Sequence, residues 1–301
     1  MINFCHIAPV SHLPFVRRYP VHLLLAHLVE ENNDYRDFYI SLKKANPNVI
    51  YHLDNSAFEM FKRGQPMYDS DKLLTMASLV KADSIVMSDY PKEDWKKTVD
   101  SAIDLIPKFK KEGFKTFFCP QSALGDLNGL MKSYEWAISN PLVDYIGVSI
   151  LACPIALGVN ETKHGDGVRD DAFRMQRYLA RWAIFEELDK RGLLSLRHMP
   201  DYPSHATTWK RFHCLGMTDG PREINLLREY HDHIFSWDSS SAIWHAINGI
   251  DYDNSPTGLR AGKLELEVDF NIQAQMSVDN AARIVYNMTH IDDMCRGYEC
   301  R

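Results

Sequence analysis

The sequence predicts an α/β protein of the (β/α)8 TIM barrel class, and three observations support this prediction. Short apolar runs alternate with longer amphipathic stretches, which is typical of parallel strands joined by crossover helices. Eight strand candidates occur, and the length of 301 residues suffices for a barrel of about 250 residues with additions. No linker rich in Pro, Gly or Ser divides the chain, so we expect a single domain over residues 1–301.

The expected strands are apolar runs bounded by turn-forming residues. In chain order they cover residues 21–28, 49–55, 84–89, 116–121, 143–150, 211–217, 233–238 and 263–270. Between them, helical periodicity and helix start and stop signals predict helices, among others over residues 69–82, 94–113, 127–140 and 220–231. Residues 151–210 combine a long helical pattern with irregular stretches. We interpret them as an insertion after strand five that covers one face of the barrel.

The composition is that of an ordinary globular chain, with 45% hydrophobic residues. No run of about 18 uncharged apolar residues occurs, and residues 1–20 lack the residue order of a signal peptide. We therefore expect a cytoplasmic protein without a membrane partner. The net charge of −6 argues against nucleic-acid binding by bulk electrostatics, although residues 108–115 and the arginines of 173–182 are candidates for a local basic face or for an ordinary solvated helix face.

The six cysteines are scattered, and four of them lie in or beside apolar runs, which favours reduced, buried thiols over a disulfide framework. His290, Cys295 and Cys300 are three candidate zinc ligands near the C-terminus, but they lack a paired Cys-x-x-Cys. A structural zinc site and a frayed C-terminal segment are the two alternatives there. We expect no cofactor.

Polar residues stand at the ends of five expected strands, which is where barrels place their chemistry. They are Asp54, Asp89, Gln121, Gly147 with Ser149, and Asp238. Each aspartate could instead cap the following helix. Together, three carboxylates, an amide and a glycine backbone could hold a flat polar heterocycle and leave one or two carboxylates to act on a neighbouring sugar.

His52 and His213 lie within expected strands, whereas the usual metal sites of barrels have histidines at strand ends. Strand alternation places His52 on the same face as Asp54. We expect packed or hydrogen-bonded histidines, and a metal hydrolase is the minor alternative.

The segments around these residues resemble, in order and spacing, the motifs of the tRNA-guanine transglycosylase family. The resemblance covers about residues 50–245 and consists of "HLDNSAFE", "VMSDYP", "CPQS", "YIGVSI", "HCLGM" and "FSWDSSSA". It implies exchange of guanine in a nucleic acid for a 7-deazaguanine such as preQ0, preQ1 or queuine.

The same resemblance implies roles for individual residues. Asp238 would be the nucleophile at C1′ of the ribose, and Asp54 would be the general acid and base. The base would be bound by Asp89, the Gln121 amide and the Gly147 backbone N–H, and further substrate-binding positions would be Phe58, Val148 and Ser149.

Departures from the family pattern bear on the choice of nucleic acid. Asn55, Ser56 and Ala57 replace loop glycines of the family, and its zinc motif near the C-terminus is missing. The chain is more similar to shortened relatives, including phage-encoded ones, that insert 7-deazaguanines into DNA. We therefore expect DNA as the partner, with tRNA as the alternative. In a duplex the target base would have to be flipped out, and the aromatic residues of 151–210 would assist this or simply pack; they are Trp182, Tyr202 and Trp209.

Two other functions stay open. One is a non-catalytic accessory subunit of the same family, which would bind nucleic acid or a catalytic partner. The other is an unrelated barrel hydrolase, such as a glycosidase. The presence of both Asp54 and Asp238 favours the transglycosylase, and whether the chain forms a homodimer is left open by the sequence.

Overall fold

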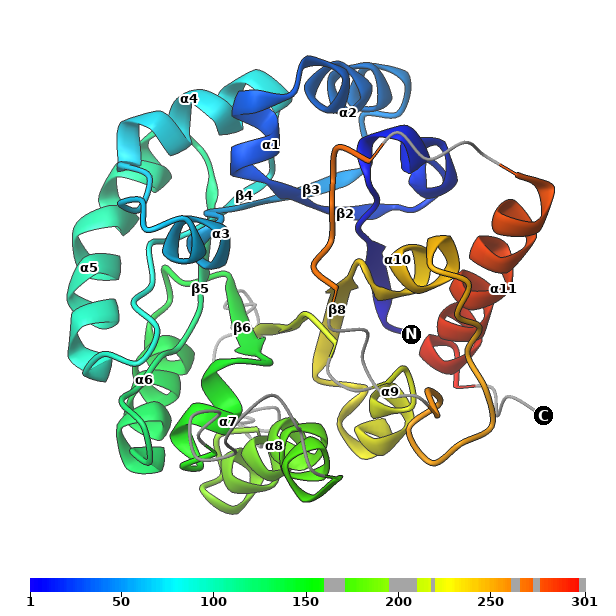
Figure 1. Ribbon diagram of the computed structural model, residues 1–301. Coiled ribbons are helices and arrows are strands. Elements are labelled where there is room, and N and C mark those ends of the chain that lie inside the picture. The colour runs from blue at the N-terminus through cyan, green and yellow to red at the C-terminus, as the bar shows by residue number, and fades with distance from the viewer. Residues whose placement is uncertain (160–170, 195–209, 218–219, 261–265, 273–276, 298–301) are drawn as a thin grey trace.

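Eight parallel strands form a nearly closed barrel with helices between them (Figure 1). The structure is a computed structural model that describes residues 1–159, 171–194, 210–217, 220–260, 266–272 and 277–297. The strands are β1 (Asn3–His6), β2 (Val21–Leu25), β3 (Ile50–Asp54), β4 (Ser84–Val86), β5 (Lys115–Phe118), β6 (Tyr145–Ser149), β7 (Arg211–Leu215) and β8 (Ile234–Ser239). They are hydrogen-bonded in the order β1-β8-β7-β6-β5-β4-β3-β2, and β1 also lies next to β2. The predicted (β/α)8 barrel is therefore confirmed.

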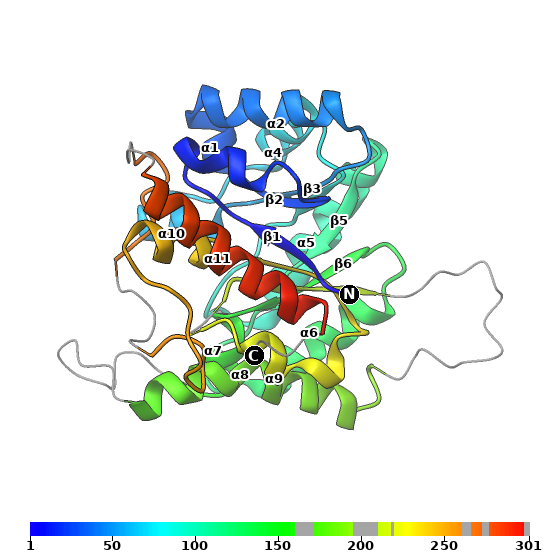
Figure 2. The same ribbon diagram turned by 90° about the vertical axis from the view of Figure 1, so that its right-hand side faces the viewer.

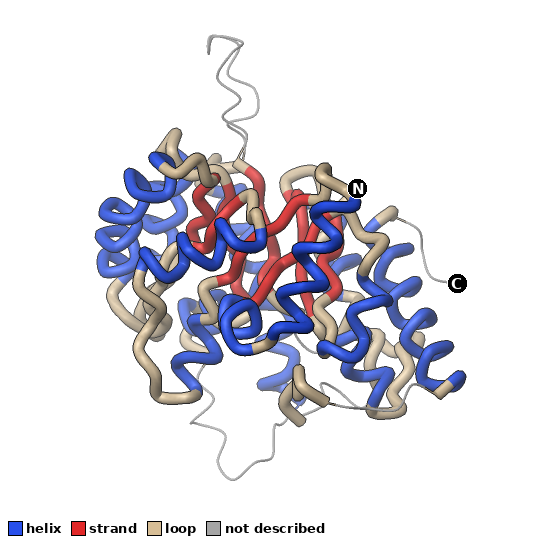
Figure 3. The backbone as a smooth tube through the Cα atoms, turned by 90° about the horizontal axis from the view of Figure 1, so that it is seen from above, coloured by secondary structure: helices blue, strands red, loops and turns tan. Residues whose placement is uncertain are grey.

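Helices surround the strands, as Figure 3 shows from above. The longer α-helices are α2 (Asn33–Ala45), α4 (Ser70–Val80), α5 (Trp95–Lys111), α6 (Leu127–Ser139), α8 (Asp171–Lys190) and α11 (Val278–Cys295). The short helices are η1 (Val10–Val16) and η4 (Arg228–Tyr230), both 3-10, and α1 (Ala26–Glu31), α3 (Ala57–Lys62), α7 (Ala152–Ala156), α9 (Glu223–Leu226) and α10 (Ser241–Ile247). Asp69, Asp94 and Asp126 cap α4, α5 and α6 by accepting a backbone N–H with their side chains.

An aromatic layer fills the N-terminal half of the barrel interior. It consists of His52, Phe117, Tyr145, His213 and Phe235, whose ring centroids lie 4.6–6.4 Å apart in the contacting pairs around His52. The β7–β8 ladder shifts register between Phe212 and His213, so that Phe212 pairs with Ile234 and His213 with Ser236. This bulge leaves Phe235 as the extra residue, and its ring joins the layer.

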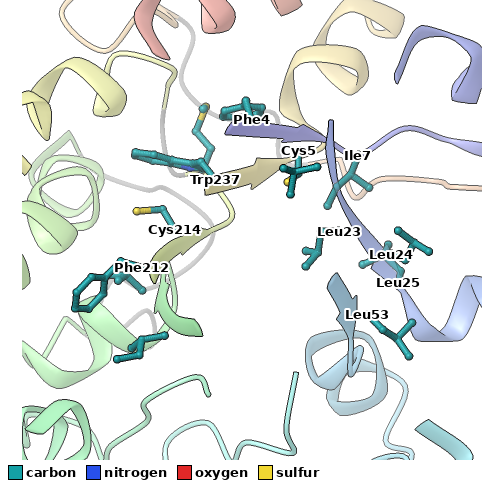
Figure 4. Packing of buried hydrophobic residues seen from close by; sticks show 14 of the residues in the cluster. Phe4, Cys5, Ile7, Leu23, Leu24, Leu25, Leu53, Phe212, Cys214 and Trp237 are labelled. Carbon is teal, nitrogen blue, oxygen red and sulfur yellow. The ribbon is translucent and has the colours of Figure 1, made fainter. Parts of the chain in front are cut away.

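Alternate strand residues face the helices instead (Figure 4). Leu24 and Leu53 point away from the barrel axis, whereas Cys5 and Leu23 point inward at the seam between β1 and β2. Trp237 points outward from β8 and is fully buried. The strands are thus covered on both faces, which explains why they read as nearly continuous apolar runs in the sequence.

The N-terminal strand β1 was not predicted. The prediction of a strand at residues 263–270 is wrong for residues 266–270, which the structure describes. Residues 266–270 form a bend and a turn, and residues 261–265 lie outside the described ranges. The physical reason is that β1 occupies the position between β8 and β2, so the ring has no edge left for a further strand. Because β1 comes first, the strand before residues 151–210 is the sixth of the barrel, not the fifth.

The segment 151–210 contains the barrel's own crossover helix. Helix α8 connects β6 to β7, whereas residues 160–170 and 195–209, with Tyr202 and Trp209, lie outside the described part of the chain. The arginines of α8 do not form a basic face, because Arg177 and Arg181 are buried. Trp182 is partly buried, and its Nε1 donates to Glu229 at 3.2 Å.

The C-terminal helix α11 packs against α10 and β1 (Figure 2). Ile2 N donates to Cys295 O at 3.3 Å, and His6 Nε2 lies 3.2 Å from Asp292 Oδ1. The five cysteines in the described ranges are buried and unpaired, as predicted, and Cys300 falls outside these ranges. No helix within the described residues has the length and apolar character needed to span a membrane.

Candidate active site

Three carboxylic acids and an amide meet at the C-terminal mouth of the barrel. Asp54 ends β3, Asp238 lies near the end of β8, and Asp89 and Gln121 follow β4 and β5. Asp89, Gln121 and Asp238 are only 5%, 2% and 5% exposed. Their mutual hydrogen bonds and charge interactions, described below, show that the structure brings the predicted residues together.

Two nitrogen atoms lie within hydrogen-bond distance of one oxygen of Asp238. His213 Nε2 lies 2.9 Å from Oδ1, and Gly216 N donates to the same oxygen at 3.1 Å. His213 Nδ1 lies 2.7 Å from Ser236 Oγ, so in the tautomer with the proton on Nε2 the ring donates to Asp238 and accepts from the serine hydroxyl. Oδ2 takes part in neither bond. Asp238 is therefore oriented through Oδ1, and it does not cap helix α10, which was the structural alternative.

His52 and His213 have the hydrogen-bonded, buried role that the sequence predicted. His52 Nδ1 lies 2.6 Å from Ser84 Oγ, and its ring is 5.8 Å from that of His213. Burial and the neighbouring His213 lower the pKa of His52 well below its ordinary value, which favours a neutral imidazole. The link from His213 to Asp238 was not predicted. The sequence could have indicated this link, because side-chain alternation along β7 and β8 places His213 and Asp238 on the same face of the barrel wall.

Asp54 has the opposite surroundings. Its Oδ2 accepts one hydrogen bond, from Ser56 N at 2.9 Å. Burial raises the pKa of Asp54 well above its ordinary value, and the negative charges of Glu59, Asp89 and Asp238 raise it further. Asp54 therefore keeps its proton in a pH range in which an exposed aspartate has lost it. Glu59, on α3, is a carboxylate near the site that sequence reasoning missed.

Asp89 lies in a network of amides. Asn55 Nδ2 donates to Asp89 Oδ1 at 2.9 Å, and Gln121 Nε2 donates to Oδ2 at 2.5 Å. Burial raises the pKa of Asp89, and these two hydrogen bonds oppose the rise. Gln121 Oε1 is buried without a hydrogen-bond partner, so it is an acceptor available to a ligand.

The loop after Asp54 has a fixed shape without the glycines of the family pattern. Ser56 has φ of 53°, a left-handed conformation that non-glycine residues seldom adopt. His27 N donates to Ser56 Oγ at 3.2 Å, and Asn55 Oδ1 accepts from Ala57 N at 2.9 Å. Side-chain hydrogen bonds thus hold this loop. Asn55 belongs to the site, although the sequence had identified it only as a departure from the glycines of the family pattern.

The β6 residues have different environments. Gly147 faces the interior, and a Cβ placed on it would lie 2.8 Å from Leu215 Cδ1. Ser149 Oγ accepts from Leu151 N at 3.1 Å, at the start of α7. Val148 is fully buried and lies on the opposite face of the strand, away from Gly147 and Ser149. The structure therefore does not bring the Val148 side chain to the mouth.

Phe58 lies on α3 immediately after the Asp54 loop and is 43% exposed, next to the mouth. Beyond Asp238, Ser239 Oγ accepts from Ser241 N at 3.0 Å and lies 2.6 Å from Ser241 Oγ. These two serines thus form a local turn at the start of α10.

Metal ligands are not gathered in the part of the chain that the structure describes. No group of three or more His, Cys, Asp or Glu residues there could hold a metal ion. His290 and Cys295 both lie on α11, and Cys300 lies outside the described residues, so the predicted zinc alternative stays untested.

Comparisons with known proteins give the chain no family. No family model matches it, and no curated protein matches it. Among solved structures, it is similar to D-psicose 3-epimerase with D-fructose, at 8% identity and a TM-score of 0.44, over 98% of this chain and 100% of that one. It is also similar to the catalytic domain of a chitinase from Pyrococcus furiosus, at 11% identity and a TM-score of 0.43, over 99% and 96% of the two chains. Neither likeness carries an argument about function. The fold and the site define a barrel with buried carboxylic acids at its C-terminal mouth, and its function has to be argued from those acids.

Proposed function

We propose that the protein is a base-exchange transglycosylase that replaces guanine in nucleic acid, DNA rather than tRNA, with a 7-deazaguanine such as preQ0 or preQ1. The observation that carries the proposal is the pair of acids with opposite surroundings, Asp238 and Asp54. Glycosyl transfer through a covalent intermediate needs one ionised and one protonated carboxyl group at the same glycosidic bond. Gly216 N donates to Asp238 Oδ1, His213 Nε2 lies 2.9 Å from the same oxygen, and burial raises the pKa of Asp54.

The exchange takes two displacements. Asp238 Oδ2 attacks C1′ of the ribose or deoxyribose, the C1′–N9 bond breaks, and Asp54 gives its proton to the departing guanine. The nucleotide is then an ester of Asp238. Asp54 takes a proton from the incoming deazaguanine, whose nitrogen attacks C1′ and releases the Asp238 carboxylate. Each group returns to its first state.

The amide network supports recognition of a guanine-like base. Asp89 can accept from the N1–H and the 2-amino group of guanine, and adenine has neither. Gln121 Nε2 already donates to Asp89, so the open atom of Gln121 is the acceptor Oε1. We therefore propose that Gln121 Oε1 accepts a hydrogen bond from a donor group of the base. The family resemblance had implied instead a contact between the Gln121 amide and O6.

The test is incorporation of radiolabelled guanine into duplex DNA or unmodified tRNA. Wild-type protein is compared with Asp238→Asn and with Asp34→Asn, which changes an exposed aspartate of α2 that takes no part in the cluster of acids. We expect label in DNA for the wild type and for Asp34→Asn, and none for Asp238→Asn.

Other outcomes separate the competing functions. Label in tRNA alone would name tRNA as the substrate. Release of base without incorporation would show a hydrolase, and nucleic-acid binding without either reaction would show an accessory subunit. Either of the last two results refutes base exchange.

A further inference from the structure

Arg181 of α8 is an arginine enclosed by the protein at one end of β6 and β7. It is 1% exposed. Its five N–H bonds all have acceptors. Nε and Nη2 donate to Glu223 Oε1 and Oε2, at 2.7 Å each. Nη1 donates to Val148 O and Leu215 O at 3.2 Å each, and Nη2 also donates to Gly216 O at 2.8 Å. A guanidinium group has five donors in a fixed plane, so this arrangement specifies arginine and not lysine.

The guanidinium also packs over the ring of Trp237, which lies on the strand that carries Asp238. Its Cζ lies 4.5 Å from the ring centroid of Trp237, and Trp237 Nε1 donates to Gly216 O at 2.8 Å. Gly216 O therefore accepts from two side chains. Glu223 balances the arginine charge, which makes the burial of both groups tolerable.

A single peptide unit connects Arg181 with Asp238. The peptide between Leu215 and Gly216 accepts from Arg181 on its oxygen and donates from its nitrogen to Asp238 Oδ1. In a trans peptide the C=O and N–H point in opposite directions, and the described chain has no cis peptide bond. A positive group on the oxygen side therefore both fixes the direction of the N–H and makes it a stronger donor to Asp238.

The glycine itself makes such a support necessary. Gly216 has φ of 71°, and a glycine in a loop after a strand is free to leave that conformation. Arg181 holds the carbonyl groups on both sides of it, Leu215 O and Gly216 O. Among the described residues, no other side chain donates to both of these atoms, although the backbone N–H of Ile150 also donates to Leu215 O, at 3.1 Å.

We propose that Arg181 is a positioning residue for Asp238: it fixes the Leu215–Gly216 peptide so that the Gly216 N–H holds Oδ1 and leaves Oδ2 for the substrate. The role of Asp238 as the nucleophile rests on the proposed function, whereas the positioning of its carboxylate by Arg181 does not. Arg181 does not touch the substrate and acts through Gly216.

The first experiment does not depend on activity. The chain has three Leu-Gly pairs, Leu124–Gly125, Leu157–Gly158 and Leu215–Gly216, so labelling Leu at 13C′ and Gly at 15N selects three amide signals in an NMR spectrum. Asp238→Asn identifies the Gly216 signal by its displacement. The double variant Arg181→Met with Glu223→Gln removes both charges, so that neither is left buried alone.

We expect the Gly216 amide proton signal to move upfield in the double variant, because its hydrogen bond to Asp238 weakens. Arg181→Lys keeps the charge but cannot reach all the acceptors, and it should move the signal in the same direction by less. The control pair is Lys43→Met with Asp83→Asn, an ion pair of 2.8 Å that lies before β3 and β4 at the other end of the barrel. An unchanged Gly216 signal in both arginine variants overturns the proposal.

The second experiment measures kcat and KM for guanine exchange. The arginine double variant should lower kcat by roughly 10- to 100-fold, as expected for a weakened hydrogen bond to a charged group, and should leave KM within about twofold. The control pair should change neither. A fall in kcat that the control pair reproduces would show general destabilisation and overturn the positioning role. If the wild type exchanges no base at all, the proposed function fails, and the Gly216 signal still decides the positioning of Asp238.

Discussion

Gly147→Ala is expected to lower the free energy of unfolding by about 1–3 kcal/mol, because it adds a methyl group to a filled barrel interior. The new Cβ would lie 2.8 Å from Leu215 Cδ1, 3.2 Å from Phe117 Cε2 and 3.3 Å from Cys119 Sγ. Phe117 and Cys119 are buried, so Leu215 has to move. In thermal unfolding the same loss corresponds to a fall in Tm of about 2–12 °C. Urea unfolding of wild type and variant measures the free energy directly.

A double-mutant cycle with Leu215→Val tests the cause. Valine lacks the Cδ1 atom that makes the shortest contact, so the double variant should be more stable than the sum of the single effects by at least about 0.5 kcal/mol. Two results would refute the reasoning: a Gly147→Ala variant within about 0.5 kcal/mol of the wild type, or strictly additive effects. Either would show that the interior at Gly147 has more room than the contacts indicate.

Two further predictions concern the site and its support. Burial raises the pKa of Asp54, so the stability that its protonated form provides is present at low pH and is lost as pH rises through the folded-state pKa. Asp54→Asn should therefore gain stability relative to the wild type as the pH rises above about 4, the ordinary pKa of an aspartate, and a pH-independent difference in urea unfolding would contradict this. Tyr134→Phe removes a hydrogen bond of 3.2 Å to Gly147 O and should cost about 0.5–1.5 kcal/mol in the same assay; no loss would mean that water replaces the hydroxyl at no cost.

The sequence predicted the barrel because its strands are covered on both faces and its helices carry start signals. Seven of the eight expected strands correspond to strands of the structure, and Asp69 and Asp94 cap helices as anticipated. Strand β1 escaped detection because it has only four residues, "NFCH", with a polar residue at each end. The pattern "KLELEVDF" alternates well, but a strand needs a free edge as well as a pattern, and β1 leaves none.

The candidate site was predictable only in part. Residues at strand ends, such as Asp54 and Asp238, could be named because a barrel brings these ends together. Their supports could not, because His213 reaches Asp238 across a shifted register and Arg181 reaches Gly216 from a helix. Arg181 looked like part of a helix surface, since sequence shows charge but not burial. Val148 was misplaced because the two faces of a fully buried strand look alike in a sequence.

The aromatic layer in the barrel interior limits how molecules can move through the site. His52, Phe117, Tyr145 and His213 are fully buried and pack ring against ring, so these described side chains fill the barrel interior beneath the acids at the C-terminal mouth. In the proposed exchange, the base that leaves C1′ and the base that replaces it would therefore both pass on the mouth side of this layer. Entry and exit are therefore successive, and initial-rate plots against each substrate at several fixed concentrations of the other should be parallel lines.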